Sequence, residues 1–507
     1  MIGNATLVIV TFLVGWVALW PARRALGAWD YHLAALPVGL VGWTAAAGAA
    51  GLVARPMTWP VVVPAVAAYA GIMFWVLRSW VCASQQDGPA PALWTYAVAG
   101  GLVGVATIAA TFSRLTIVGY DSWAHYQSSA IYLADHGRPS AAILGEYGPL
   151  IPSVIAAGRM FGGDWIYSVY PVMALNLLLL TVGSAFRVAE FRVSRRAATV
   201  LAILTGLVLL LTRSFATYSF YVHSQMYSAL FLALAVVPVV LLALREELAE
   251  QGATEPVESD ARASAVLLVS GVATAGRALT RPDGLVYVFV PMLVVVALRF
   301  QRGWGLQRLV AYAGPLLAVL AASYIGAFLR LHAWKSDKMS GRTALLCLVL
   351  IAVVPVIGEV LARWDRVAWL RRGHNAIRAM LVLDILGVAG AAAVARGRFV
   401  VSAKNMVTNL FSTGGYQDLW YFLAGVVLVT IVLGILKCGE GPAYTLFAIA
   451  QFFAVALVVH GVTHPGRLSP ADSFNRVAFH IVPVILFYTA ASVAVFWSAR
   501  AARKDAA

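Results

Sequence analysis

The chain alternates between long apolar segments and short polar ones. A helix crosses the hydrocarbon core of a bilayer with about 20 predominantly apolar residues, and about 15 segments of this chain approach or reach that length. They predict an all-α fold, a polytopic bundle of transmembrane helices. The predicted spans are residues 5–22, 33–54, 60–82, 95–116, 166–186, 197–212, 225–244, 264–279, 285–299, 309–330, 343–362, 377–396, 420–436, 443–461 and 477–498.

The stretch that breaks this pattern follows the fourth predicted span. Residues 119–152 read GYDSWAHYQSSAIYLADHGRPSAAILGEYGPLIP, which is too polar to cross a membrane. Ionisable groups gathered in one loop of a membrane protein point to chemistry or recognition there. The sequence therefore predicts that a large loop over residues 117–165 carries the function. The acidic and histidine residues of 119–152 are Asp121, His125, Asp135, His136 and Glu146.

Composition supports a membrane protein and argues against a nucleic-acid-binding one. Hydrophobic residues make up 61% of the chain and charged residues only 12%, whereas soluble domains carry about 25% charged residues. The formal charge of +15 comes from basic residues that lie mainly in short loops. This is the positive-inside pattern, and such residues face anionic lipid headgroups, so no nucleic-acid partner is expected. The three cysteines have no disulfide or zinc spacing.

The distribution of basic residues predicts the topology. Residues 1–20 lack a basic n-region, and Arg23 and Arg24 follow the first apolar run, so we expect a permanent first span with its N-terminus outside. The excess of basic residues in alternate loops places residues 119–152 outside and the C-terminus in the cytoplasm. The basic residues expected on the cytoplasmic side are Arg23, Arg24, Arg78, Arg192, Arg195, Arg196, Arg245, Arg299, Arg302, Arg308, Arg363, Arg366, Arg371, Arg372, Lys437, Arg500, Arg503 and Lys504.

Five polar clusters fall on the expected external face, most of them at span ends. Asp121 and His125 are four residues apart, so they share a face if that segment is helical. Arg476 and His480 have the same spacing at the start of the last span. The clusters are GYDSWAHY at 119–126, EYGPL at 146–150, YVHSQ at 221–225, TRPDG at 280–284 and SFNRVAFH at 473–480.

These groups fit the transfer of a sugar from a lipid-linked phosphate to a hydroxyl acceptor. Such a reaction needs a carboxylate that deprotonates the acceptor, and Asp121 suits this role. The lipid phosphate that leaves needs cationic or hydrogen-bonding partners, and Arg281, Arg476 and His480 suit that role. The remaining candidates for substrate binding are His125, Tyr126, Glu146, Tyr147, His223, Gln225, Asp283 and Asn475.

Each of these candidates also has a purely structural interpretation. Asp121 could cap the helix that follows it, and Arg281 and Asp283 could form an ion pair that closes a tight turn. Arg476 could extend to lipid headgroups. The histidines and the Tyr and Trp residues could belong to the membrane interface. The functional interpretation rests on the gathering of five clusters on one face.

The pattern resembles the GT-C superfamily of integral-membrane glycosyltransferases, which includes protein O-mannosyltransferases, the aminoarabinose transferase of lipid A and dolichyl-phosphate glucosyltransferases. The resemblance rests on four features: Asp121 directly after a span, the YGPL turn at 147–150, TRPDG at 280–284 between two spans, and Asn475, Arg476, His480 and Pro483 near the start of the last span. It covers roughly residues 95–498. We therefore expect extra N-terminal transmembrane helices over 1–90 and a GT-C-like catalytic domain over 91–507.

The resemblance implies an inverting transfer of a hexose or pentose from a polyprenyl-phosphate donor, with Asp121 as base. It places the active site on the non-cytoplasmic face of a multi-pass cell-membrane protein. The acceptor would be a cell-envelope glycan, lipid or protein. No cofactor is expected, and no divalent metal either, because Ser122 and Trp123 stand where the family's acidic pair would continue.

Two other functions stay open. An O-antigen-type polymerase or ligase would use external Arg and His in a late loop, and the predicted loop 396–419 with Lys404, Tyr416 and Asp418 is a candidate. A transporter or flippase of lipid-linked glycans would also need a polar cavity. Transporters place such groups near the bilayer midplane on broken helices or repeated halves, whereas here they fall at span ends.

Overall fold

The computed structural model describes residues 2–53, 55–81, 90–113, 126–136, 148–163, 169–221, 223–251, 260–281, 283–331, 341–413, 417–432, 440–463 and 474–505. These residues are almost entirely helical, so the prediction of an all-α polytopic bundle is confirmed. Each predicted span overlaps a helix. The long helices are α1 (Ile2–Leu19), α2 (Arg23–Val53), α3 (Trp59–Val81), α4 (Leu93–Ser113), α8 (Val169–Glu190), α9 (Arg195–Leu211), α11 (Ser224–Glu250), α12 (Asp260–Thr280), α14 (Phe289–Gln301), α15 (Leu306–Leu331), α16 (Gly341–Arg363), α17 (Asn375–Val394), α19 (Gln417–Val432), α20 (Glu440–Thr463) and α22 (Val482–Asp505).

Shorter helices lie between the long ones. Helix α18 occupies residues that were predicted as part of a loop, so the helical content there was underestimated. Eleven stretches of the described residues are long and apolar enough to cross a membrane, with α1 and α2 forming one of them, so the count of 15 spans stays a prediction. The shorter elements are η1 (Trp20–Ala22), α5 (Ser128–His136), α7 (Leu150–Met160), α10 (Arg213–Tyr218), α13 (Gly284–Tyr287), η3 (Asp365–Arg371), α18 (Arg396–Thr408), η4 (Asn409–Thr413), α21 (Phe474–Ala478) and η7 (Phe479–Ile481).

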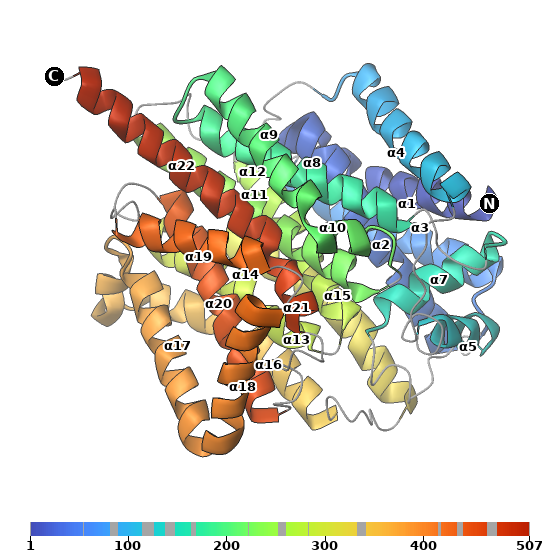
Figure 1. Ribbon diagram of the computed structural model, residues 1–507. Helices are drawn as coiled ribbons and strands as arrows, with labels where there is room; N and C mark the ends of the chain where they lie inside the picture. The colour runs from blue at the N-terminus through green and yellow to red at the C-terminus, as the bar shows by residue number, and fades with distance from the viewer. Residues whose placement is uncertain are drawn as a thin grey trace.

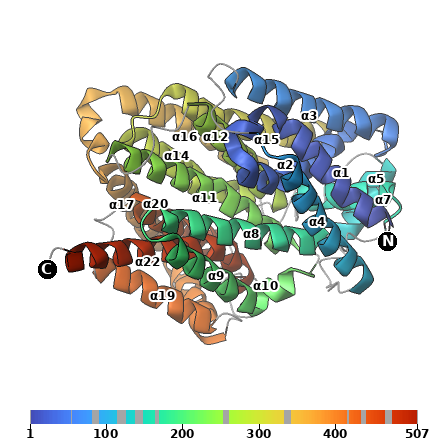
Figure 2. The ribbon, with the colours of Figure 1, turned by 90° about the horizontal axis from the view of Figure 1, so that it is seen from above.

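Helices α11 and α12 form the centre of the bundle. The apolar stretch of each is completely buried by the helices around it. Figures 1 and 2 show them in the middle, with α1–α3 on one side and α17–α20 on the other. Lipid offers no hydrophobic force between helices, so close packing holds them together, and small residues permit it. A Cβ at Gly271 of α12 would lie 2.2 Å from the carbonyl oxygen of Tyr312 on α15.

The N-terminal helices share this core. A Cβ at Gly15 of α1 would lie 1.9 Å from the carbonyl oxygen of Ala35 on α2, which shows how closely those two helices pack. Helix α2 also packs against α7, α12 and α15. The backbone amide of Met57 donates to the carbonyl of Ala134 on α5 at 3.1 Å. The N-terminal helices therefore support the described part of the predicted external loop, while the division into two domains stays a prediction.

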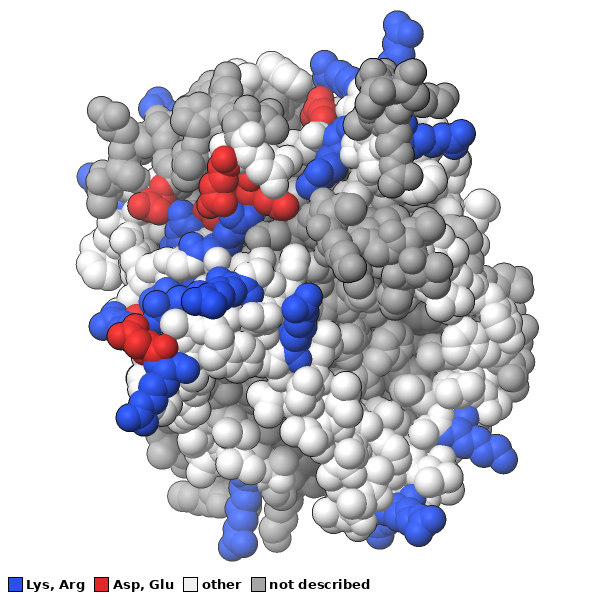
Figure 3. Space-filling view, turned by 90° about the vertical axis from the view of Figure 1, so that its left-hand side faces the viewer, with Lys and Arg blue, Asp and Glu red and all other residues white. Residues whose placement is uncertain are grey.

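Ion pairs gather at the end of the bundle that carries the predicted cytoplasmic loops. Figure 3 shows blue side chains grouped around red ones over part of this face. Because the pairs join loops that the sequence assigns to one side, the structure places those loops together; which side faces the cytoplasm stays a prediction. The pairs include Arg187–Asp30 at 2.7 Å, Arg302–Glu250 at 2.6 Å, Arg308–Asp260 at 3.0 Å and Arg299–Glu359 at 2.9 Å.

Candidate functional site

Several of the predicted polar clusters meet at the opposite end of the bundle. The meeting point is formed by the first residues of α11, the turn between α12 and α13, the short helix η7 and described residues of the predicted external loop. Chain segments more than 200 residues apart contribute to it, since Gln225 and His480 are separated by 255 positions. Helix packing, not local sequence, brings these segments together.

The turn between α12 and α13 presents an arginine held by a carboxylate. Arg281 Nε donates to Asp283 Oδ1 at 2.9 Å, and Arg281 Nη1 lies 3.5 Å from Ser224 Oγ at the start of α11. Both charged side chains are largely buried, with 15% and 11% of their surface exposed. Burial alone would lower the pKa of Arg281, but the Asp283 carboxylate outweighs it and the pKa is raised. The guanidinium is therefore charged at any physiological pH.

At Gly148 the predicted external loop contacts this turn. A Cβ at Gly148 would lie 2.1 Å from the carbonyl oxygen of Leu279 and 2.5 Å from the backbone nitrogen of Arg281. Only glycine permits two backbones to approach this closely. The YGPL and TRPDG motifs, which the sequence analysis identified separately, thus contact each other. Helix α7 begins directly after this contact, at Leu150.

A chain of buried polar side chains runs behind the turn. Arg277 Nη2 lies 3.2 Å from His480 Nδ1, and His480 Nε2 is hydrogen-bonded to Gln225 Oε1. Gln225 Nε2 lies 3.2 Å from His223 Nδ1, which also accepts from the backbone amide of Ser224 at 2.9 Å. Arg277, Gln225 and His480 are at most 1% exposed. Buried groups of this polarity are costly unless hydrogen-bonded to one another, so the chain fixes these side chains in place.

Aromatic side chains surround the outer end of this chain. The ring of Tyr126 stands edge-on to His223 with 5.7 Å between centroids, and the Tyr221 ring lies 5.3 Å from the same imidazole. Tyr170 and Tyr227 form a further edge-to-face pair behind them at 5.4 Å. Tyr126, Tyr170 and Tyr227 are buried, whereas Tyr221 is partly exposed, so its ring offers a flat apolar face of the kind that suits a sugar ring.

The structure unites six of the predicted site residues. Four others lie outside the described residues: Asp121, His125, Glu146 and Tyr147. Asn475 and Arg476 lie on α21, and the side chain of Asn475 is not described. The described residues nearest to the missing ones, Tyr126 and Gly148, both lie at the site. The residues brought together are Tyr126, His223, Gln225, Arg281, Asp283 and His480.

Sequence reasoning missed Arg277. It is the single charged residue within the apolar run 264–279, and an ionisable residue inside a span is a functional candidate by default. That signal would have found it. Arg277 also stacks on Tyr287, with its guanidinium carbon 4.9 Å from the ring centroid. The part of the chain that the structure describes contains no group of three or more His, Cys, Asp or Glu side chains that could hold a metal ion.

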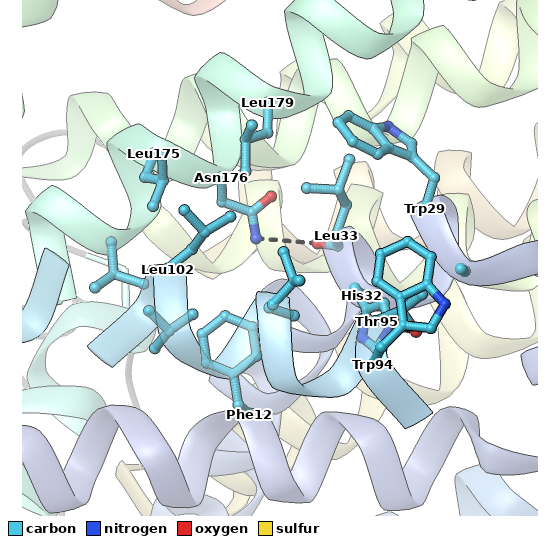
Figure 4. Close-up of a pocket in the computed structure, with 15 residues that line it drawn as sticks. Phe12, Trp29, His32, Leu33, Trp94, Thr95, Leu102, Leu175, Asn176 and Leu179 are labelled. Carbon is cyan, nitrogen blue, oxygen red and sulfur yellow. Dashed lines mark hydrogen bonds between the residues drawn. The ribbon is translucent and has the colours of Figure 1, made fainter. Parts of the chain in front are cut away.

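The bundle also contains a cavity of about 310 Å³ between α1, α2, α4 and α8. Unlike the polar site, this cavity is lined mostly by apolar side chains. Figure 4 shows that leucine, phenylalanine and tryptophan side chains line it, with the amide nitrogen of Asn176 directed at the carbonyl of Leu33. Pro37 has no N–H, so this carbonyl loses its helical donor, and Asn176 Nδ2 replaces it at 3.1 Å. The lining is suited to hydrocarbon, not to an unpaired charge.

Comparisons with known proteins give distant structural similarity only. No family model matches the chain, and no curated protein does. One solved structure, an oligosaccharyltransferase of Archaeoglobus fulgidus tethered to an acceptor peptide, is 16% identical with a TM-score of 0.38, over 78% of this chain and 55% of that one. A second, the oligosaccharyltransferase AglB of the same organism with an inhibitory peptide and a dolichol-phosphate, is 15% identical with a TM-score of 0.42, over 82% and 52%. The chain thus spans about half the length of each, and its function is inferred below from its own residues.

Proposed function

We propose that this chain is a membrane glycosyltransferase that moves a sugar from a polyprenyl-phosphate donor to a cell-envelope acceptor. The observation that carries the proposal is the buried cationic cluster at Arg277 and Arg281. It lies at a helix end, and the motif that closes the predicted acidic external loop contacts it at Gly148. A lipid phosphate sits at that depth of a membrane, and a sugar attached to it would project toward the loop.

The charge of the cluster suits an anion. Arg277 and Arg281 both lie within electrostatic reach of Asp283. Among the described residues of the cluster, two guanidinium groups and one carboxylate leave one positive charge in excess. A buried charge without a partner is strongly unfavourable, so an anionic ligand stabilises this arrangement. A phosphate oxygen accepts charge-assisted hydrogen bonds from arginine better than a neutral group does.

The reaction follows from these groups. The acceptor hydroxyl attacks the anomeric carbon while the Asp121 carboxylate takes its proton. The bond between the anomeric carbon and the phosphate oxygen breaks, and its electron pair leaves on the polyprenyl phosphate. Attack opposite to the leaving group inverts the configuration of the sugar. The negative charge that develops on the phosphate is stabilised by Arg281 and Arg476.

Other predicted residues bind the sugar or the acceptor, or hold the arginine in place. The Tyr221 ring packs against the sugar, and Tyr126 contacts His223 beside it. Asp283 holds Arg281 in place. His125, Glu146, Tyr147 and Asn475 complete the binding surface. The active site faces the non-cytoplasmic side, the transferred group is a hexose or pentose, and the acceptor is a glycan, lipid or protein of the cell envelope.

A transfer assay tests the proposal. Purified protein in nanodiscs receives a panel of radiolabelled polyprenyl-phosphate sugars, with wild type, Asp121→Asn and the matched control Asp135→Asn side by side. Asp135 lies exposed on α5 of the same loop, so its loss should leave transfer unchanged. Removing the base should lower the rate by about 10²- to 10⁴-fold. Wild-type release of free polyprenyl phosphate supports the enzyme. Movement of intact labelled lipid between leaflets would instead support a transporter, and equal activity of Asp121→Asn would exclude it as base.

A further inference from the structure

The buried chain behind the site has a defined direction. An arginine guanidinium can only donate hydrogen bonds. His480 Nδ1, 3.2 Å from Arg277 Nη2, must therefore accept, which places the proton of His480 on Nε2. This nitrogen then donates to Gln225 Oε1, so the amide group of Gln225 is oriented with its nitrogen toward His223.

The hydrogen bonds at His223, the other end of this row of side chains, give the same direction independently. The backbone amide of Ser224 can only donate, and it lies 2.9 Å from His223 Nδ1. Gln225 Nε2 approaches the same nitrogen at 3.2 Å. His223 Nδ1 is thus an acceptor for two donors, and a proton on it would face both of them. His223 is therefore a neutral imidazole with its proton on Nε2, directed away from Ser224 and Gln225.

His223 in this state is a hydrogen-bond donor beside Arg281. Ser224 Oγ lies 3.3 Å from His223 Nδ1 and 3.5 Å from Arg281 Nη1, so one serine separates the imidazole from the guanidinium. Tyr126 contacts the imidazole ring and lies within electrostatic reach of Arg281. Arg281 is thus reached through Ser224 on the Nδ1 side of the imidazole, and the Nε2–H of His223 points to the other side of the ring. Hydrogen bonds in a buried chain polarise one another, so the charge of Arg277 strengthens the final N–H as a donor.

We infer that Arg277 and His480 are positioning residues that, through Gln225, hold His223 as a neutral imidazole whose Nε2–H donates to an oxygen of the bound substrate. This inference rests on the proposed function for the identity of the substrate. His480 acts on Gln225 in this arrangement, and Arg277 on His480, so neither needs to touch the substrate. His223 is the member of the chain that does.

Nitrogen-15 NMR of the histidines tests the chain without any substrate. The chain has nine histidines, so the signals of His223 and His480 are assigned by their loss in His223→Phe and His480→Phe. The two neutral tautomers and the charged imidazole have distinct nitrogen shifts. Wild type should show both histidines neutral, with the proton on Nε2. A charged His223, or a proton on its Nδ1, would overturn the inference whatever the enzyme does.

Two variants of Arg277 separate positioning from packing. Arg277→Lys keeps a cation that only donates, whereas Arg277→Met fills similar space without a donor. Arg277→Met should give a mixture of His480 tautomers and lower kcat by roughly tenfold with little change in KM, since a donor to the transition state is weakened. Arg277→Lys should restore the single tautomer and most of kcat. Tautomer and kcat both unchanged in Arg277→Met would overturn the role of Arg277.

The two proposals fail in distinguishable ways. If no donor in the panel is consumed, the proposed function fails while the tautomer result still decides the direction of the chain. If transfer occurs but His223→Phe retains wild-type kcat, the chain is structural and the inference fails while the enzyme stands. Phe keeps the ring contacts with Tyr126 and Tyr221 and removes both nitrogens. Loss of one donor of this kind should cost about 10²- to 10³-fold in kcat. If Arg277→Met does not fold, wild-type NMR and His223→Phe still decide the outcome.

Discussion

Gly148→Ala should damage both the stability and the activity of this protein. The new methyl carbon would lie 2.1 Å from the carbonyl oxygen of Leu279 and 2.5 Å from the nitrogen of Arg281. Both neighbours are backbone atoms, so no flexible side chain can swing away. An ordinary carbon–oxygen contact needs about 3.5 Å, so the two turns must separate by roughly 1 Å or more.

The magnitude follows from this displacement. Overpacking by one methyl group in a rigid contact costs about 1–3 kcal/mol of stability. A shift of 1 Å in a catalytic arrangement costs on the order of 10²-fold in rate. Because the displaced turn carries Arg281, we expect kcat for sugar transfer to fall by about 10²-fold, together with a lower midpoint of thermal denaturation.

The assay needs a matched glycine. Gly305→Ala is suitable because Gly305 lies in a turn, and a Cβ there would meet no atom within 4 Å. Both variants are measured in nanodiscs for thermal denaturation and for release of polyprenyl phosphate. The control should behave as wild type. If Gly148→Ala does so as well, the predicted external loop is not held against the turn that carries Arg281, and the arrangement of the site given above is wrong.

Three other substitutions have expected outcomes. Arg476→Ala should weaken donor binding as well as rate, because it removes a phosphate partner used in both ground and transition states; a donor titration beside a kcat measurement checks this, and an unchanged Kd would contradict it. Asn176→Leu should lower the free energy of unfolding by about 1–3 kcal/mol, because it leaves the Leu33 carbonyl without a hydrogen-bond donor. Adding Pro37→Ala should recover part of this loss, because alanine restores the helical N–H. Additive effects of the two changes in the double variant would refute this account. Arg187→Met should cost stability near the lower end of about 3–5 kcal/mol, because Asp30 keeps the longer pair with Arg262 at 3.8 Å and the nearby charge of Arg245. A denaturation midpoint equal to that of wild type would show that the pair contributes nothing.

The sequence was sufficient for the long apolar helices and for most of the polar candidates. Each predicted span overlaps a helix because hydrocarbon forces a spanning segment to satisfy its own backbone groups, a rule that depends on local composition alone. Arg281, Asp283, His223 and His480 were found for a related reason: polar residues at the ends of apolar runs stand out against them. Arg277 could have been found by the same contrast, since it interrupts an apolar run.

Local rules were less reliable where neighbouring segments decide the conformation. Residues 396–408 were predicted as loop and form α18. Arg476 and His480 were expected on one helical face four residues apart. Instead α21 ends at Ala478 and His480 lies in the 3-10 turn η7, where residues three apart align. His480 is thereby free to face Arg277 and Gln225, partners that a four-residue spacing does not indicate.

Sequence alone determined that this protein is a membrane-spanning helical bundle with its polar groups at the span ends. The tertiary structure alone decided which ends meet. Gly148 touches the turn that carries Arg281, and His480 joins partners 203 and 255 positions away. The periodicity and spacing of residues in the sequence predict contacts within one helix. Contacts between helices depend instead on where small residues let two backbones approach each other. The site is a product of that packing, so it becomes visible only when the helices are assembled.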